Sequence, residues 1–171
     1  MVIQITNNVF IMKKIILTAV FSLFGLAASF AQFEEGKFYL GTSFDGAGIS
    51  YSETTKMSLG IGVNAGYMFR QDWLAMAEAG FTYSNSDLQD LHIGAACRYY
   101  IEQNGLFLQA GVKYVHQAPD YNDLKITPEV GYCFFLNEHL TVEPSVYYDM
   151  SLSNFSDKSR FGIKVGLGLY F

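Results

Sequence analysis

The chain has 171 residues, enough for a single domain, and half of them are apolar while only 16% are charged. A typical soluble protein carries about 25% charged residues, so part of this protein faces something less polar than water. The net charge of −5 argues against nucleic acid as a partner, because binding to phosphates needs an excess of Lys and Arg.

The first predicted element is a secretory signal peptide at residues 12–31, MKKIILTAVFSLFGLAASFA. It has a basic start, an apolar middle and small residues before a predicted cut between Ala31 and Gln32. An uncleaved membrane helix is the alternative, because the apolar run is close to the shortest length that spans a bilayer. Residues 1–11 precede a complete signal and are interpreted as an upstream extension. Loss of the two lysines of the signal would leave a mature chain with a net charge of −7.

The remainder, residues 32–171, is predicted to be one β-barrel domain. Its many Tyr, Phe and Gly residues favour strands over helices. Apolar residues occupy every second position in a series of segments, and this period of two indicates strands with two different faces. The eight segments are Phe38–Phe44, Met57–Phe69, Trp73–Tyr83, Leu91–Ile101, Leu106–Tyr114, Leu124–Leu136, Leu140–Leu152 and Phe161–Phe171.

Short and long connections alternate between these segments. The short ones are residues 70–72, 102–105 and 137–139, and the longer, polar ones are residues 45–56, 84–90, 117–123 and 153–159. Short turns at one end and longer loops at the other are typical of an up-and-down barrel that crosses a membrane. We therefore predict an all-β fold, an eight-stranded antiparallel transmembrane β-barrel.

The two faces of the strands predict which side chains point inward. The interior of an eight-stranded barrel is just wide enough for side chains to fill, so the bulky apolar face must point outward and the glycine-rich face inward. A Lys or Arg that faces lipid at mid-depth costs about 2–4 kcal/mol. The charged residues in the middle of the strands all lie at the same alternate positions as the glycines, which we call the inward parity, so they too are predicted to point inward. Unpaired buried charges are costly, so we predict a plugged lumen with a lattice of ion pairs. Its members are Glu78, Arg98, Lys113, Glu129, Glu143 and Lys164.

Aromatic residues gather at both ends of the outward face. Two aromatic belts at the water boundaries are expected of a membrane-spanning barrel. The predicted belt residues are Phe69, Trp73, Tyr99 and Phe134 near the short turns, and Tyr83, Tyr114 and Tyr148 near the long loops.

Three stretches of the chain, RFGIKVGLGLYF, ITPEVGYCFFLNEHL and DWLAMAEAGFTYS, together with the signal ending in Ala31, resemble a known family. They are similar to the small eight-stranded outer-membrane β-barrel proteins of Gram-negative bacteria, the OmpA-like and OmpX-like group, over about residues 33–171. The resemblance implies a place in the bacterial outer membrane, with outer-membrane lipid and lipopolysaccharide as partners. It also implies that Phe171 is part of the signal read by the barrel-assembly machinery. We expect a monomer.

Two pairs of residues test the predicted register. Cys97 and Cys133 fall on opposite faces of strands that are not neighbours, so we expect two free thiols. Pro128 and Pro144 lie inside the sixth and seventh segments, where proline cannot donate to the hydrogen-bond ladder. We predict a bulge or a missing rung near each proline, unless the strand limits there are wrong.

The sequence contains no motif that points to a cofactor, a metal site or catalysis. The three His residues share no metal-ligand spacing. A lipid A-modifying hydrolase would need Ser, His and an acid close together, yet His116 lies on the outward parity and Ser151 and Asp149 on the inward one. Acids of the long loops motivate the hypothesis that divalent cations bridge them to lipopolysaccharide. They are Asp45, Glu53, Asp87, Asp90, Asp120, Asp123 and Asp157.

These observations favour a non-enzymatic protein with a structural or surface-interaction role. The alternative is a narrow outer-membrane channel for ions or small solutes. A lipid A-modifying enzyme is the third possibility.

Overall fold

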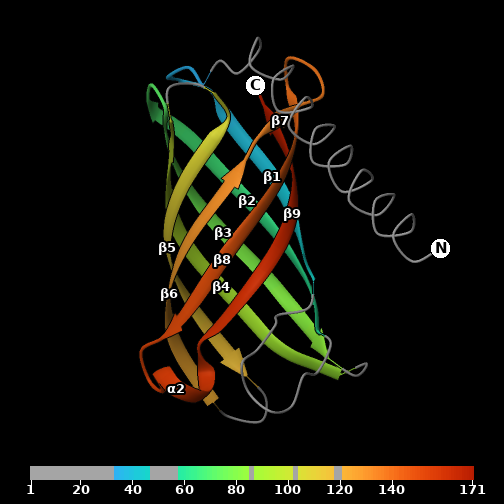
Figure 1. The fold of residues 1–171 in the computed structure, drawn as a ribbon, viewed down its shortest axis with the longest axis vertical. Helices are drawn as coiled ribbons and strands as arrows, with labels where there is room; N and C mark the ends of the chain where they lie inside the picture. Colours follow the sequence, from blue (N-terminus) through green and yellow to red (C-terminus); the bar gives the residue numbers. More distant parts are fainter. Residues whose placement is uncertain (1–32, 47–57, 85–86, 102–103, 118–120) are drawn as a thin grey trace, which may run out of the picture.

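The computed structural model describes residues 33–46, 58–84, 87–101, 104–117 and 121–171. Its strands form one antiparallel sheet that closes on itself as a tall barrel (Figure 1). The strands are β1 (Phe38–Gly46), β2 (Ser58–Arg70), β3 (Trp73–Ser84), β4 (Asp87–Tyr100), β5 (Leu106–Gln117), β6 (Tyr121–Tyr132), β7 (Phe134–Phe135), β8 (Leu140–Ser151) and β9 (Arg160–Tyr170).

The barrel closes where the first strand, β1, pairs with the last, β9. Strands β6 and β7 are two parts of one interrupted barrel strand, because both pair with β8 in a single register. This register runs from Lys125 opposite Ser151 to Phe135 opposite Thr141. When β6 and β7 are counted as one, the barrel has eight strands, so the predicted eight-stranded antiparallel barrel is confirmed.

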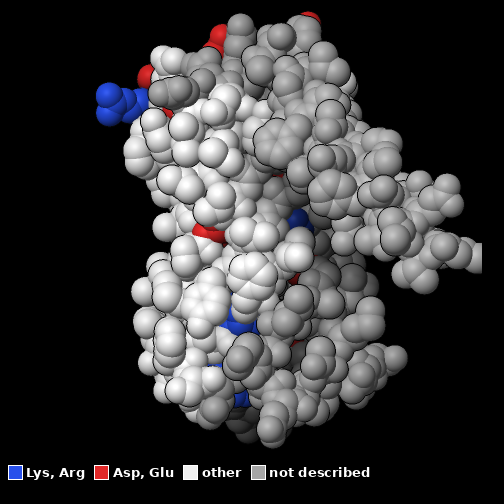
Figure 2. Space-filling model, in the orientation of Figure 1, with Lys and Arg blue, Asp and Glu red and all other residues white. Residues whose placement is uncertain are grey.

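The outer face of the barrel is apolar and the inner face is small or polar. Leu59, Val146 and Ile163 expose 56%, 41% and 50% of their surfaces, whereas Glu129 exposes 3%. Figure 2 shows a wall that is uncharged over most of its visible height, with charged atoms at its upper end and recessed in gaps between uncharged residues. This order is the reverse of that in a soluble protein, as the alternation predicted.

The two ends of the barrel differ. We call the end with the short connections, at the top of Figure 1, the turn end, and the opposite end the loop end. The turn end also carries the C-terminus. A short helix, α2 (Phe155–Lys158), which the sequence analysis did not predict, lies at the loop end between β8 and β9.

Three of the predicted long loops, 45–56, 84–90 and 117–123, were wrong in their limits, and β1 continues to Gly46. Strand β3 continues to Ser84, β4 begins at Asp87 and β6 begins at Tyr121. Strand pairing does not end where the apolar residues end, because polar side chains on the inward parity remain inside the barrel wall.

This change moves three of the predicted loop acids into strands. Asp90 and Asp123 are 6% and 2% exposed, and Asp45 is half-buried in β1. These three acids are therefore strand residues and not loop residues, while cation bridging between the loop acids and lipopolysaccharide stays a prediction. Among the described residues, no group of three His, Cys, Asp or Glu is placed to hold a metal ion. The remaining loop acids, or their side chains, lie outside the described part of the chain: Glu53, Asp87, Asp120 and Asp157.

The predicted extension at residues 1–11 and the predicted signal peptide at residues 12–31 also lie outside the described residues, and both stay predictions. In the part of the chain that the structure describes, no helix is long and apolar enough to cross a membrane.

Both prolines interrupt the same pairing. The rung at Pro128 is missing between β6 and β8, and the rung at Pro144 is missing where β8 passes from β6 to β7. The register is the same on either side of each gap, so these are missing rungs and not bulges, and the predicted irregularity is confirmed. Register shifts occur instead beside Arg70 and Tyr83.

The two cysteines lie on different faces, as predicted. Cys97 is exposed on the outer face of β4, while Cys133, between β6 and β7, is buried inside, and both thiols are free.

Asp72, in the turn between β2 and β3, is in an unfavourable environment. Its φ of 63° is left-handed, a conformation that Gly, Asn and Asp tolerate best, and its buried Oδ1 has no hydrogen-bond partner. Burial raises the pKa of the Asp72 carboxyl above its ordinary value. The folded protein therefore favours the neutral form of Asp72. Its stabilising contribution is complete at pH values below the pKa of Asp72 in the unfolded chain, and it is lost as the pH rises through the higher pKa in the folded protein.

We therefore expect Asp72→Asn to increase the free energy of unfolding at neutral pH by at most about 0.5 kcal/mol, because it removes a charge that is only partly shielded from water and keeps the left-handed preference. The gain should shrink as pH falls and Asp72 becomes protonated. Urea unfolding of the refolded barrel at two pH values measures this difference. Asp72→Ala is the control and should be destabilising at both pH values, since a left-handed Ala costs about 1–2 kcal/mol.

Candidate functional site: the interior of the barrel

The interior at the turn end is filled by apolar and aromatic side chains. Phe33, just before β1, is fully buried, and its ring stacks on Tyr100 with 3.5 Å between centroids. The Phe33 ring also meets Tyr170 edge-on at 5.7 Å, and its carbonyl accepts a hydrogen bond from Asp72 N at 3.1 Å. We call this group the aromatic layer. It consists of Phe33, Tyr39, Met68, Leu74, Met76, Ala96, Tyr100, Phe107, Cys133 and Tyr170.

One ion pair is set within the aromatic layer. Arg98 Nη1 lies 2.7 Å from Glu143 Oε2, and both side chains are 3% exposed. Glu143 also accepts hydrogen bonds from the hydroxyls of Tyr39 at 2.9 Å, Thr141 at 2.7 Å and Tyr170 at 3.2 Å. A carboxylate with this many donors is satisfied without water, which makes its burial tolerable.

A second ion pair lies further along the barrel and is linked to the first. Lys164 Nζ lies 2.6 Å from Glu129 Oε2. Gln109 accepts a hydrogen bond from Arg98 Nε at 2.9 Å and donates one to Glu129 at 3.1 Å. Arg98, Gln109, Glu129 and Lys164 therefore form a chain of contacts across the interior, from β4 through β5 and β6 to β9. We call it the cross-barrel chain.

The third charged centre surrounds Lys113, nearer the loop end. Its Nζ lies 3.7 Å from Glu78 Oε1 and 3.6 Å from Asp149 Oδ1. Asp149 also accepts a hydrogen bond from Thr127 at 2.8 Å and pairs with Arg160 at 3.3 Å. The Lys113 contacts are longer than those of the other two pairs, and one ammonium group is shared between two carboxylates.

Little space remains around this third centre. A cavity of about 10 Å³ lies beside it, which is room for about one water molecule. The residues that line it are Asp45, Thr82, Asp90, His92, Lys113, Val115, Lys125, Tyr147, Asp149 and Arg160.

The six interior charges named by the sequence analysis all lie inside the barrel. The structure brings them together as Arg98 with Glu143, Lys164 with Glu129, and Lys113 with Glu78. Their partners Asp149 and Arg160 were not predicted as members of the lattice, although both also lie on the inner face, near strand ends.

The aromatic layer is a correction, because the predicted interior consisted of small, polar and ionic side chains and no apolar cluster. A signal for it was present in the sequence. Close to the short turns, the inward parity is occupied by large residues: Tyr39, Met68, Leu74, Tyr100, Phe107 and Tyr170.

The residues predicted to form two belts lie on the outer face at the two ends. Trp73 and Tyr99 approach to 4.9 Å between ring centroids at the turn end, and Tyr148 meets Phe155 of α2 at 6.4 Å at the loop end. All of the predicted belt residues are exposed or half-buried: Phe69, Trp73, Tyr99, Phe134, Tyr83, Tyr114 and Tyr148.

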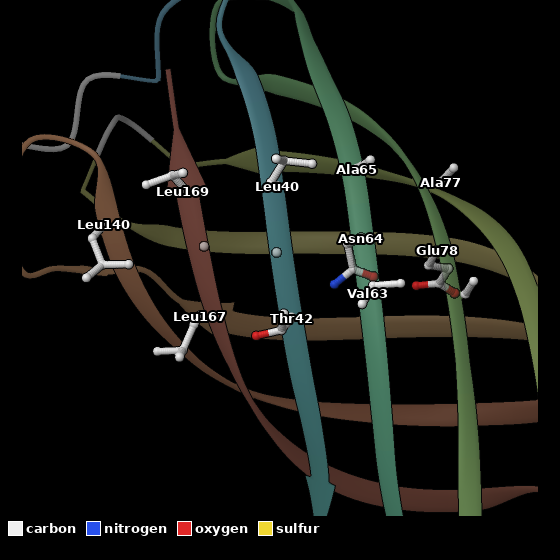
Figure 3. Close-up of a pocket in the computed structure, with 13 residues that line it drawn as sticks. Leu40, Thr42, Val63, Asn64, Ala65, Ala77, Glu78, Leu140, Leu167 and Leu169 are labelled. Atoms are coloured by element: carbon white, nitrogen blue, oxygen red, sulfur yellow. The ribbon is translucent and has the colours of Figure 1, made fainter.

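A wide hollow of about 650 Å³ lies outside the wall, over β9, β1, β2 and β3 (Figure 3). It is formed because Thr42, Ala65 and Ala77 are small, while Leu167 and Leu169 project beside them. Its surface is almost entirely hydrocarbon. We call it the β1 hollow, and it is a depression in the apolar outer face, to whose lining Asn64 and Glu78 of the inner face also contribute.

A family model described as "Outer membrane protein beta-barrel domain" matches residues 16–171. The chain belongs to this family. The apolar outer face of this outer-membrane β-barrel therefore faces lipid, and the protein is located in the bacterial outer membrane. In such barrels the short turns face the periplasm and the longer loops face outward, so we place the turn end on the periplasmic side.

Solved structures share the fold of this outer-membrane β-barrel. The N-terminal barrel domain of Pseudomonas aeruginosa OprF has a TM-score of 0.63 at 13% identity, over 80% of this chain and 98% of that chain. Neisserial surface protein A has a TM-score of 0.58 at 17% identity, over 80% and 100%. Pseudomonas aeruginosa OprG has a TM-score of 0.55 at 14% identity, over 84% and 99%. No curated protein sequence matches the chain.

Proposed function

We propose that this protein is a structural or surface-interaction protein of the outer membrane with a plugged lumen. The supporting observation is that side chains cross the interior at three successive levels. The aromatic layer fills the turn end, the cross-barrel chain follows, and Lys113 bridges Glu78 and Asp149 nearer the loop end. A permeating ion would have to separate buried ion pairs, and separation of one such pair is strongly unfavourable.

The refolded barrel is expected to give no steady unitary openings in planar lipid bilayers. Heat-modifiable gel migration of the same sample shows whether the protein is folded, so a silent sample can be separated from a misfolded one. Steady openings from folded protein would contradict the plugged lumen and favour the channel.

A narrow channel is the second candidate, because one observation favours it. Lys113 makes two longer contacts, at 3.7 and 3.6 Å, and not one short one. An ammonium group that can move between Glu78 and Asp149 is the most easily rearranged charge of the interior. If this movement opens a path, Lys113→Met should change the conductance, whereas a plugged barrel stays silent with either residue.

We propose that the protein is not an enzyme. The residues considered for lipid A modification are separated: His116 is exposed on the outer face and contacts Asn122 at 2.7 Å, while Ser151 is 2% exposed on the inner face. Asp149 is engaged with Lys113 and Arg160. Incubation with lipid A followed by mass spectrometry tests this proposal, and any loss or transfer of an acyl chain would contradict it.

The proposed partners are outer-membrane lipid and lipopolysaccharide around the barrel, and the barrel-assembly machinery at Phe171. The backbone of Phe171 pairs with Phe38, with N···O distances of 2.7 and 3.0 Å, so the residue proposed as an assembly signal lies at the junction between β9 and β1. We propose a monomer. Nucleic acid is not a proposed partner, since the net charge is −5.

A further inference from the structure

The pairing of β8 with β6 and β7, which we call the proline seam, lacks backbone hydrogen-bond donors at two positions. Leu152 N donates to Leu124 O at 3.0 Å, and Leu136 N donates to Leu140 O at 2.8 Å. Even-numbered residues on this seam therefore direct their N–H and C=O groups across it. Pro128 is one of these even-numbered residues and lies opposite Tyr148. The carbonyl of Tyr148 therefore faces a proline nitrogen, which carries no hydrogen.

Pro144 is also even-numbered, so its nitrogen points into the same seam from the other strand. Both prolines thus remove a donor from one pairing. Among the described residues, the other seven pairings of the barrel show no missing rung apart from register shifts at the ends of β2–β3 and β3–β4.

The inner side of the proline seam is held by side chains. Thr127 Oγ1 donates to Asp149 Oδ1 at 2.8 Å across the first gap, and the Lys164–Glu129 pair lies behind it at 2.6 Å. The gap is therefore supported from the lumen, and the outer side is where a further group can approach Tyr148.

A groove of about 350 Å³ lies along the outer side of this seam. Leu108, Pro128, Val130, Val146, Tyr148 and Phe161 line it from the outer face. Gln109, Glu129 and Tyr147, which alternate with these residues along the strands, also contribute to its lining, and the groove includes Pro128 and Tyr148 on the two sides of the missing rung. Tyr148 and Phe161 lie toward the loop end, whereas Leu108 lies near the turn end of β5, so the groove extends along the wall into the outer half of the membrane.

The position of the groove determines the chemistry of its occupant. It faces lipid, so the occupant is largely hydrocarbon. Within a bilayer a backbone carbonyl without a donor is costly, so an occupant that brings one hydroxyl is favoured over one that brings none. Chains of glycerophospholipids carry no hydroxyl. The acyl chains of lipid A, which anchors lipopolysaccharide in the outer leaflet, include hydroxylated ones.

We propose that the groove on the proline seam binds a hydroxylated acyl chain of lipid A, with its hydroxyl donating to the carbonyl of Tyr148. This site deepens the proposed contact with lipopolysaccharide and rests on the proposed orientation, with the loop end outward. The chain lies along Val130 and Val146, and the aromatic rings of Tyr148 and Phe161 border it toward the surface.

The test uses the full barrel refolded in detergent micelles. Hydroxytetradecanoic acid and tetradecanoic acid, which differ only in the hydroxyl, are titrated while the amide resonances of Val146 and Tyr148 are followed. The hydroxylated acid should bind about fivefold more tightly, the effect of one net hydrogen bond. Equal affinities would overturn the proposal. Lipid A and phosphatidylethanolamine, compared by native mass spectrometry, then distinguish the two membrane sources, and lipid A should be retained preferentially.

Two variants locate the site. Pro128→Ala restores the missing N–H and should abolish the preference for the hydroxylated acid while leaving the barrel folded. Val146→Trp fills the groove and should abolish binding of both acids, whereas Ala77→Trp, in the β1 hollow, should leave binding unchanged. A preference that survives Pro128→Ala, or that is lost with Ala77→Trp, would overturn the assignment. Conductance is measured separately, so a conducting barrel that keeps the preference would contradict only the plugged lumen.

Discussion

Glu143→Gln is expected to lower the free energy of unfolding by about 3–5 kcal/mol, the cost of leaving one member of a buried ion pair alone. The substitution keeps the shape of the side chain but removes its charge. Arg98, which is 3% exposed and lies 3.9 Å above the ring of Phe107, then loses the carboxylate with which it pairs. Urea unfolding in lipid vesicles, followed by the fluorescence of Trp73, the only tryptophan, measures the change.

The control is the double variant Arg98→Met, Glu143→Leu. Replacement of both charges by apolar side chains of similar size is often neutral or stabilising, and the surrounding aromatic layer suits them. We expect the double variant to be much closer to the wild type than Glu143→Gln. A single substitution that costs less than about 1 kcal/mol would mean that the Arg98–Glu143 pair is hydrated, contrary to its burial.

Phe33→Ala is expected to lower the free energy of unfolding by about 3–5 kcal/mol, the range for Phe→Ala in a protein core. Phe33 precedes β1, yet it is fully buried and packs on Tyr100 and Tyr170. Its loss leaves a cavity in the aromatic layer, which a barrel wall tied by backbone hydrogen bonds cannot collapse to fill. The same urea experiment measures the effect.

Phe38→Ala is the matched control for Phe33→Ala. Phe38 lies at the start of β1 and is 55% exposed on the outer face, so lipid replaces the deleted ring and the loss should be clearly smaller. Equal losses from the two variants would show that Phe33 does not act as part of the core. Both variants retain Trp73, so one fluorescence signal serves for each.

The fold was largely predictable from the sequence, because the outer face of a barrel in lipid must be apolar at every second residue. Ile163 and Val165 alternate with Lys164 and Gly166, and no other regular structure uses that period. The strand limits were less predictable. Asp90 and Asp123 resemble loop residues by composition, but they continue the inward parity of β4 and β6 and lie inside the wall.

The interior was only partly predictable, for a physical reason. The alternation along each strand places Arg98 and Glu143 on the inner face. It does not determine at what level along the barrel axis side chains from two distant strands meet. That level depends on the stagger of the whole barrel, which also brings Gln109 between Arg98 and Glu129. Phe33 carries no periodic signal at all, since it precedes the first strand.

The pairing of β1 with β9 has a consequence for how the chain is made. The first strand to leave the ribosome finds one of its two neighbours only when the last one has been synthesised and exported. Until then both borders of the growing sheet are open to other chains. A product shortened by even its final strand would retain two such borders, so we expect early termination to give material that aggregates or is degraded, and no smaller working protein.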